Sequence, residues 1–172
     1  IRDRYIHVMS EIGKRVFADR AEYMGDPDFV SVPVEALTDA NYITQRAADI
    51  QPTSISDTPS VKPGLKESEA TTQFSIMDRW GNAVANTTTI NLTFGSGVVV
   101  TGAGFLLNDE MDDFSAKPGV PNFFGAVGGE ANAIESYKRM LSSMTPTLVT
   151  KDDQVVLVTG SPGGTTIISS VT

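Results

Sequence analysis

A threonine that follows a linker-like segment is the residue of this sequence whose position most suggests chemistry. Thr71 stands where the polar stretch SEATTQ runs into an alternating strand pattern. A threonine hydroxyl is a weak nucleophile until a base takes its proton. The single histidine, His7, lies in a helical pattern far from Thr71 in the sequence, so these residues cannot form a Ser-His-Asp triad. We interpret His7 as a surface residue of a helix.

A threonine can supply its own base when it is the first residue of a chain. Its α-amine titrates near 7.7–8.0 and can accept the hydroxyl proton. Because an internal threonine has no such amine, the bond between Ala70 and Thr71 would first have to be cut. The alternative interpretation of this junction is a plain domain boundary.

Two further motifs allow several kinds of chemistry. The stretch GSPGG, residues 160–164, exposes backbone N–H groups that could hold an oxyanion. It lacks the Lys-Ser/Thr pair of a nucleotide-binding loop, and a simple turn is the competing interpretation. The stretch NDEMDD, residues 108–113, has Asp113 where a calcium-binding EF-hand loop needs glycine, so we interpret it as an acidic loop.

Three segments must position these residues. Residues 1–50 have helical apolar spacing, residues 51–70 are rich in proline and serine and predict a flexible linker, and residues 71–172 are β-rich. We expect a short helix over residues 129–141. The expected strands are residues 71–77, 83–92, 97–102, 145–151 and 154–160. The pattern indicates an α+β fold, and both ends of the sequence look like cut points in a longer protein.

Composition excludes several classes of function. The chain carries 13 basic and 21 acidic residues, a net charge of −8, which argues against a nucleic-acid partner. The absence of cysteine excludes disulfides and thiolate chemistry within these residues. No apolar run approaches the ~20 residues of a membrane helix, and no targeting signal is visible.

Four motifs follow one another along the sequence: TTQFSIMDRWGNAVANTTTINLTFGSG, GFLLNDEMDDFSAKPGVPN, LSSMTPT and VTGSPGG. Together, and in this order, they resemble motifs of the gamma-glutamyltranspeptidase family of N-terminal-nucleophile hydrolases. The resemblance extends from Thr71 to Thr172, and residues 1–70 resemble the end of that family's large subunit more weakly. Position 73 is Gln where many members have His, and we expect no chemical role for it.

The resemblance implies a role for each matching residue. Thr71 would be the nucleophile and the first residue of the small subunit. Thr89 would be the second threonine, whose hydroxyl hydrogen-bonds the nucleophile. The implied ligands of the substrate α-amine are Asn91, Glu110 and Asp113. The implied ligands of its α-carboxylate are Ser142 and Ser143, and the implied oxyanion hole is Gly163 and Gly164. Carboxylates suit an ammonium, and adjacent hydroxyls suit a carboxylate.

The family also implies an activity and a fold. The expected reaction is transfer and hydrolysis of the γ-glutamyl group of glutathione and other γ-glutamyl amides, with amino acids, peptides or water as acceptors. No cofactor or metal is expected. The expected fold is part of a four-layer αββα sandwich, and the expected compartment of the full-length protein is the periplasm or the exterior.

Part of the family's machinery would lie outside these residues. The family's arginine that binds the substrate α-carboxylate lies in the large subunit, upstream of Ile1, so the rest of that subunit is an expected partner. We therefore expect the chain by itself to be uncut between Ala70 and Thr71 and inactive. The alternatives are a different N-terminal-nucleophile amidohydrolase, similar to cephalosporin acylases, and an inert structural fragment.

Overall fold

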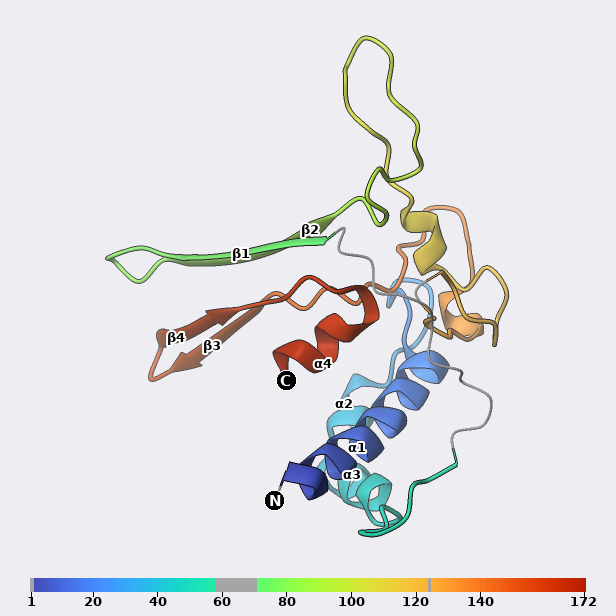
Figure 1. Ribbon diagram of the computed structural model, residues 1–172, viewed down its shortest axis with the longest axis vertical. Coiled ribbons are helices and arrows are strands. Elements are labelled where there is room, and N and C mark those ends of the chain that lie inside the picture. Colours follow the sequence, from blue (N-terminus) through green and yellow to red (C-terminus); the bar gives the residue numbers. More distant parts are fainter. Residues whose placement is uncertain (1, 58–70, 124) are drawn as a thin grey trace. The chain divides into compact units, whose positions relative to one another are not determined.

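The computed structural model of the chain describes residues 2–57, 71–123 and 125–172 (Figure 1). Most of the predicted linker, residues 58–70 with Ala70, lies outside the described residues. Contacts group the chain into two units. Unit 1 comprises Ile1–Pro63, Phe114–Pro121 and Val127–Leu141, and unit 2 comprises Gly64–Asp113, Asn122–Ala126 and Ser142–Thr172. Every residue to which the sequence assigns a catalytic or substrate-binding role belongs to unit 2.

Three helices form the first part of unit 1, which confirms the helical prediction for the start of the chain. They are α1 (Arg2–Tyr23), α2 (Val34–Thr38) and α3 (Ala40–Ala47). Asp39 begins α3 because its Oδ1 accepts hydrogen bonds from the N–H groups of Asn41 and Tyr42, at 2.9 and 3.0 Å. Such a cap satisfies backbone donors that the first helical turn cannot pair internally.

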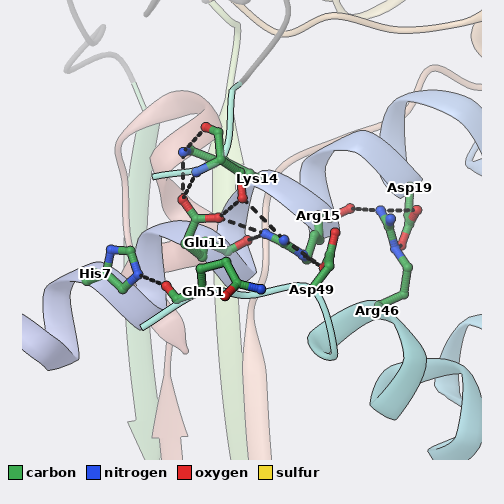
Figure 2. A network of polar contacts seen from close by, with 9 residues as sticks. His7, Glu11, Lys14, Arg15, Asp19, Arg46, Asp49 and Gln51 are labelled. Atoms are coloured by element: carbon green, nitrogen blue, oxygen red, sulfur yellow. Dashed lines mark hydrogen bonds and ion pairs between the residues drawn. The ribbon is translucent and has the colours of Figure 1, made fainter. Parts of the chain in front are cut away.

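A charged network on α1 holds the first residues of the predicted linker (Figure 2). The Glu11 side chain is 1% exposed, and its Oε2 pairs with Arg15 Nη1 at 2.9 Å. Arg15 Nη2 reaches Asp49 Oδ1 at 2.7 Å, and the Ser56 N–H donates to Glu11 Oε1 at 3.1 Å. Hydrogen bonds from Lys14 and Ser56 hold the pKa of Glu11 well below its usual range. The buried charge is therefore paired, as burial requires.

His7 lies on the same side of α1 as this network. Its Nε2 lies 2.7 Å from the carbonyl oxygen of Gln51 (Figure 2). The prediction that His7 lies on a helix is confirmed. Nearby, Arg46 of α3 pairs with Asp19 of α1, with Nη2 and Oδ1 2.7 Å apart. Ion pairs thus join α1 to α3 and to the residues that follow α3.

Unit 1 combines residues from both sides of the 70–71 junction. The Arg139 guanidinium donates to both carboxylate oxygens of Asp26, at 2.6 and 3.1 Å, and its own N–H adds a third bond at 2.8 Å. This pairing holds the pKa of the buried Asp26 well below its usual range. The Gly129 N–H also donates to Ala21 O at 2.8 Å. A cut at the junction would therefore leave unit 1 built from two chains.

The predicted helix over residues 129–141 is wrong in extent. The structure has only a 3-10 turn, η2 (Glu130–Asn132), and the rest is irregular. Distant side chains take the backbone donors that a helix would need. The Leu141 N–H donates to the buried Asn132 side chain at 3.0 Å, and the Arg139 N–H donates to Asp26. These tertiary bonds compete with helical ones.

Two antiparallel hairpins dominate unit 2. The first pairs β1 (Thr71–Met77) with β2 (Ala83–Thr89), and the second pairs β3 (Thr147–Lys151) with β4 (Gln154–Thr159). In Figure 1 both hairpin tips lie at the left and both open ends point to the right. The fold therefore mixes helices with small antiparallel sheets, which agrees with the α+β expectation.

Local turn chemistry closes each hairpin. In the first, Asp78 Oδ1 accepts from the N–H groups of Trp80 and Asn82 at 2.8 and 2.9 Å. In the second, Asp152 and Asp153 form a two-residue turn with φ of 51° and 58°. Positive φ at both turn residues matches the right-handed twist of the flanking strands. The two hairpins are therefore the parts of the β-rich region whose structure is determined by residues close together in the sequence.

The predicted strand over residues 97–102 is also wrong in extent. The chain turns back at residues 101–104, and only an isolated bridge between Val99 and Leu106 forms there. Gly102 and Gly104 have φ of 84° and 76°, which interrupts the extended backbone. The predicted strand over residues 83–92 ends at Thr89, because Asn91 has a φ of 75°.

Few apolar side chains are buried in either unit. Among the described residues, only Phe114 and Ile167 form a buried hydrophobic core, and strand residues such as Ile76 and Leu157 are at least half exposed. Exposed apolar faces on two-stranded sheets need further layers for stability. No helix within the described segments has the length and apolar character that a membrane crossing requires.

Candidate active site

Thr71 and Thr89 lie opposite each other at the open end of the first hairpin. The register pairs Thr71 with Thr89 and Gln73 with Thr87. Directly opposed residues, and residues two apart on one strand, share a face of the sheet. The face formed by these four residues is half-buried, whereas their neighbours Thr72 and Thr88 are exposed. Both hydroxyls that the sequence singles out therefore lie on the covered face.

The second hairpin approaches this covered face just after β4. A Cβ atom at Gly160 would lie 2.6 Å from Gln73 Nε2 and even closer to the rest of that amide. Gly160 follows β4 directly, and Gln73 is two residues from Thr71. The chain that leads from β4 into the glycine loop thus begins on the same side of the sheet as the Thr71 hydroxyl.

The glycine loop joins β4 to a short helical segment. Gly163 and Gly164 precede or begin η3 (Gly164–Thr166), which continues into α4 (Ile167–Val171). Their φ values are 130° and 55°, a region that side chains rarely adopt. Within residues 2–57, 71–123 and 125–172, neither N–H group donates a hydrogen bond. Two such donors could stabilise an oxyanion.

Asn91 connects the threonines to the acidic segment. It is 7% exposed, its N–H donates to Thr89 Oγ1 at 2.9 Å, and its Nδ2 donates to Asp109 O at 2.9 Å. The first bond holds the Thr89 side chain in one rotamer. The second orients the amide so that Oδ1, an acceptor, is the atom suited to a substrate ammonium.

Glu110 and Asp113 stand side by side in the 3-10 turn η1 (Glu110–Asp113). Residues three apart in such a turn eclipse each other, and the two carboxyl groups hydrogen-bond. Burial, followed by the negative charge of Asp113, raises the pKa of Glu110 to about 7. A cation placed between the two groups would relieve this repulsion. The pair therefore has the electrostatic character of an ammonium site.

Ser142 and Ser143 lie at the open end of the second hairpin. They precede β3 by five and four residues, and Gly164 and Gly163 follow β4 by the same numbers. Since β3 and β4 are antiparallel, the serine pair and the glycine pair leave the same end of the hairpin. Ser142 is exposed and Ser143 is half-buried, and Ser142 Oγ accepts a local hydrogen bond from the Met144 N–H at 3.1 Å.

Unit 2 links most of the predicted site residues through direct contacts. One path runs from Thr71 through Thr89, Asn91 and Asp109 to the Glu110–Asp113 pair. The described segments contain no group of three or more histidine or acidic side chains placed to hold a metal ion.

Sequence reasoning missed two residues of this region, Gln73 and Gly160. The alternation Thr71, Gln73 along β1 already placed Gln73 on the face of the predicted nucleophile. Nothing in the sequence indicated which glycine would touch it.

Comparisons with known proteins give the chain a family. The family model described as Gamma-glutamyltranspeptidase matches residues 1–172. The chain is 66% identical over 168 residues to the glutathione hydrolase proenzyme of Pseudomonas aeruginosa, an alignment that covers 98% of the chain. The chain spans 30% of the length of that relative.

A solved structure and a differently named relative extend the comparison. The gamma-glutamyltranspeptidase from Pseudomonas nitroreducens complexed with L-DON matches with a TM-score of 0.57 and 68% identity, over 58% of this chain and 52% of that chain. The Acylase ACY 1 proenzyme of Pseudomonas sp. (strain SE83) is 35% identical over 96% of this chain and 28% of that proenzyme. Identity to these two Pseudomonas proteins, named for glutathione and γ-glutamyl chemistry, is thus much higher than identity to the acylase. The chain belongs to the gamma-glutamyltranspeptidase family.

Proposed function

We propose that the complete protein carrying this chain transfers and hydrolyses γ-glutamyl groups of glutathione and other γ-glutamyl amides. The reaction passes through an ester on Thr71, after the protein has cut itself between Ala70 and Thr71. The observation that carries this proposal is the register of β1 and β2, which pairs Thr71 with Thr89 on one covered face. High identity to a glutathione hydrolase proenzyme supports it.

The chemical steps follow from the groups available at the site. The α-amine of the new N-terminal Thr71 accepts the hydroxyl proton, and Oγ1 attacks the γ-carbonyl carbon. The N–H groups of Gly163 and Gly164 stabilise the oxyanion that forms. The amine of the substrate's γ-amide takes up the proton from the Thr71 α-ammonium group and leaves, and the γ-glutamyl ester of Thr71 remains. Water or an amino acid then attacks the ester and regenerates Thr71.

The head group of the substrate is bound by charge. Glu110 and Asp113, with Asn91 Oδ1, accept hydrogen bonds from the α-ammonium group. Ser142 and Ser143 donate to the α-carboxylate. We infer that a large-subunit arginine upstream of Ile1 adds a bidentate contact, which two serines cannot replace.

The segments of the chain fit the architecture of such a proenzyme. We infer that residues 1–50 end the large subunit, that residues 51–70 form the processing linker, and that residues 71–172 begin the small subunit. The exposed apolar faces of the hairpins then pack in a four-layer αββα sandwich with the rest of the protein. We place the complete protein in the periplasm or outside the cell.

The experiment that tests this function compares two chromogenic anilides in the complete protein. One carries a γ-glutamyl group, and the other carries a glutaryl group, which lacks only the α-ammonium. We expect the γ-glutamyl compound to be preferred in kcat/KM by roughly ten- to a hundred-fold, the value of a hydrogen bond to a charged group. A preference for the glutaryl compound would indicate an acylase, and activity on neither would indicate an inert domain.

The pH dependence of substrate binding gives a further expected result. Because the pKa of Glu110 is raised to about 7, this residue is mostly neutral below that pH and binds an ammonium poorly. KM for the γ-glutamyl anilide should rise roughly tenfold between pH 8 and pH 5. In Glu110→Gln the ionisation near pH 7 should vanish from the KM profile. An unchanged profile would remove Glu110 from the ammonium site.

A further inference from the structure

The side chain of Gln73 occupies the space between the two hairpins of unit 2. It projects from β1 on the face that also carries Thr71. The Gln73 amide lies against Gly160, where even a Cβ atom would come within 2.6 Å of Nε2. Gly160 is the residue at which the chain leaves β4 for the glycine loop. The amide therefore limits how closely that loop can approach β1.

Hydrogen bonds hold this amide at both of its polar atoms. Its Oε1 accepts from Thr87 Oγ1, which lies across the hairpin on β2. Its Nε2 donates to Phe74 O at 3.0 Å and to Ser75 Oγ at 3.2 Å. A long polar side chain fixed at both atoms behaves as a rigid spacer, because its rotamers are no longer free.

We propose that Gln73 is a positioning residue that sets the distance between Thr71 and the oxyanion donors of the glycine loop. The amide fixes the distance between Gly160 and β1. Gly163 and Gly164 follow Gly160 by three and four residues, so their positions depend on that distance. This inference rests on the proposed function, since it assigns a purpose to the same site. Gln73 itself touches neither substrate nor reacting atoms.

A displaced oxyanion hole has a specific kinetic signature. The two N–H groups act on charge that develops in the transition state, so their misplacement lowers kcat more than it raises KM. The hydrogen bonds of the Gln73 amide go to Thr87, Phe74 and Ser75, and none of these three is proposed to bind the substrate head group. A general loss of structure would instead reduce the melting temperature and the amount of cut protein.

The test shortens the side chain at position 73 and adds a methyl group at position 160 in the complete protein, separately and together. Gln73→Ala should lower kcat for the γ-glutamyl anilide about tenfold, with KM within about twofold of the wild type. Gly160→Ala should also lower kcat, because its methyl group collides with the amide. The double variant should recover much of the loss, since the shortened side chain leaves room for that methyl group. All rates are divided by the cut fraction, measured by intact mass.

Two more variants keep the inference testable if Gln73→Ala folds poorly. Thr87→Val removes the donor to Gln73 Oε1 without changing shape, and it should lower kcat by a smaller factor. Thr88→Ala removes a hydroxyl from the opposite, exposed face and should leave kcat unchanged.

If Gly160→Ala lowers kcat by the same factor in the wild type and in the Gln73→Ala variant, the positioning role is overturned. A normal kcat in Gln73→Ala would overturn it as well. If the wild type itself lacks γ-glutamyl activity, the proposed function fails, and the positioning role fails with it.

Discussion

Replacing Thr71 with alanine should leave the complete protein as one uncut and inactive chain. In the proposed mechanism, the Thr71 hydroxyl attacks the Ala70 carbonyl carbon and shifts the acyl group from nitrogen to oxygen, and the substitution removes this hydroxyl. Without the cut there is no α-amine to act as base. Because nucleophile and base are lost together, activity on a γ-glutamyl anilide should fall by more than about 10³-fold. Intact mass and an anilide assay measure both effects.

Two neighbouring substitutions provide the controls. Thr71→Ser keeps a hydroxyl and should still be cut, although more slowly. Thr72→Ala removes the adjacent hydroxyl, which pairs with Thr88 on the exposed face, and should be cut at the same bond with near-normal activity. A Thr71→Ala protein that is still cut between residues 70 and 71 would show that another group performs the cleavage.

The 172 residues alone should remain uncut and inactive. Among the described residues only Phe114 and Ile167 are buried apolar side chains, so little packing is available to strain the bond before Thr71. Mass spectrometry of this chain decides the matter. A product that begins at Thr71 would mean that units 1 and 2 suffice for cleavage.

Replacing Asp113 with alanine should lower kcat/KM for γ-glutamyl amides by roughly ten- to a hundred-fold in the complete protein, mainly through KM. The expected loss is that of a hydrogen bond to a charged group, about 1.5–3 kcal/mol. Activity on the glutaryl anilide should change little, because that compound has no ammonium. The pKa of Glu110 should also fall, because the charge of Asp113 contributes to its elevation.

Asp112 offers a matched control in the same 3-10 turn. Its Oδ2 accepts from the Phe123 N–H at 3.1 Å, and it has no role in the proposed ammonium site. Asp112→Asn should therefore keep kcat/KM within about twofold, and any fall in its melting temperature should reflect only the weakened contact with Phe123. Wild-type kcat/KM in Asp113→Ala would exclude Asp113 as an ammonium ligand.

The elements that sequence reasoning predicted well are those with local causes. The two hairpins follow from alternating strands and from turn residues such as Asp78 and the Asp152–Asp153 pair. The helices of unit 1 follow from periodic apolar spacing and from the Asp39 cap. Each of these interactions joins residues close together in the sequence, so the pattern alone contains them.

The failures have distant causes. Residues 129–141 have the composition of a helix, but Asp26 takes the N–H and the guanidinium of Arg139 from 113 positions away. Residues 97–102 read as a strand, but the segment folds back on itself at residues 101–104. A single sequence does not reveal such partners, and buried ion pairs or loop contacts override local preference.

The sequence by itself determined the chemical groups of this protein: a threonine nucleophile candidate after a linker, an acidic cluster, a serine pair and a glycine loop. Family membership follows from those motifs and from the comparisons. Only the tertiary structure decided that Thr71 and Thr89 share a covered face, that Gly160 lies against Gln73, and that unit 1 combines residues from both sides of the 70–71 junction. Residue type and pairing within a hairpin follow from neighbouring residues, whereas the covering of one face and the close approach of Gly160 to Gln73 depend on the packing of segments that are far apart along the chain.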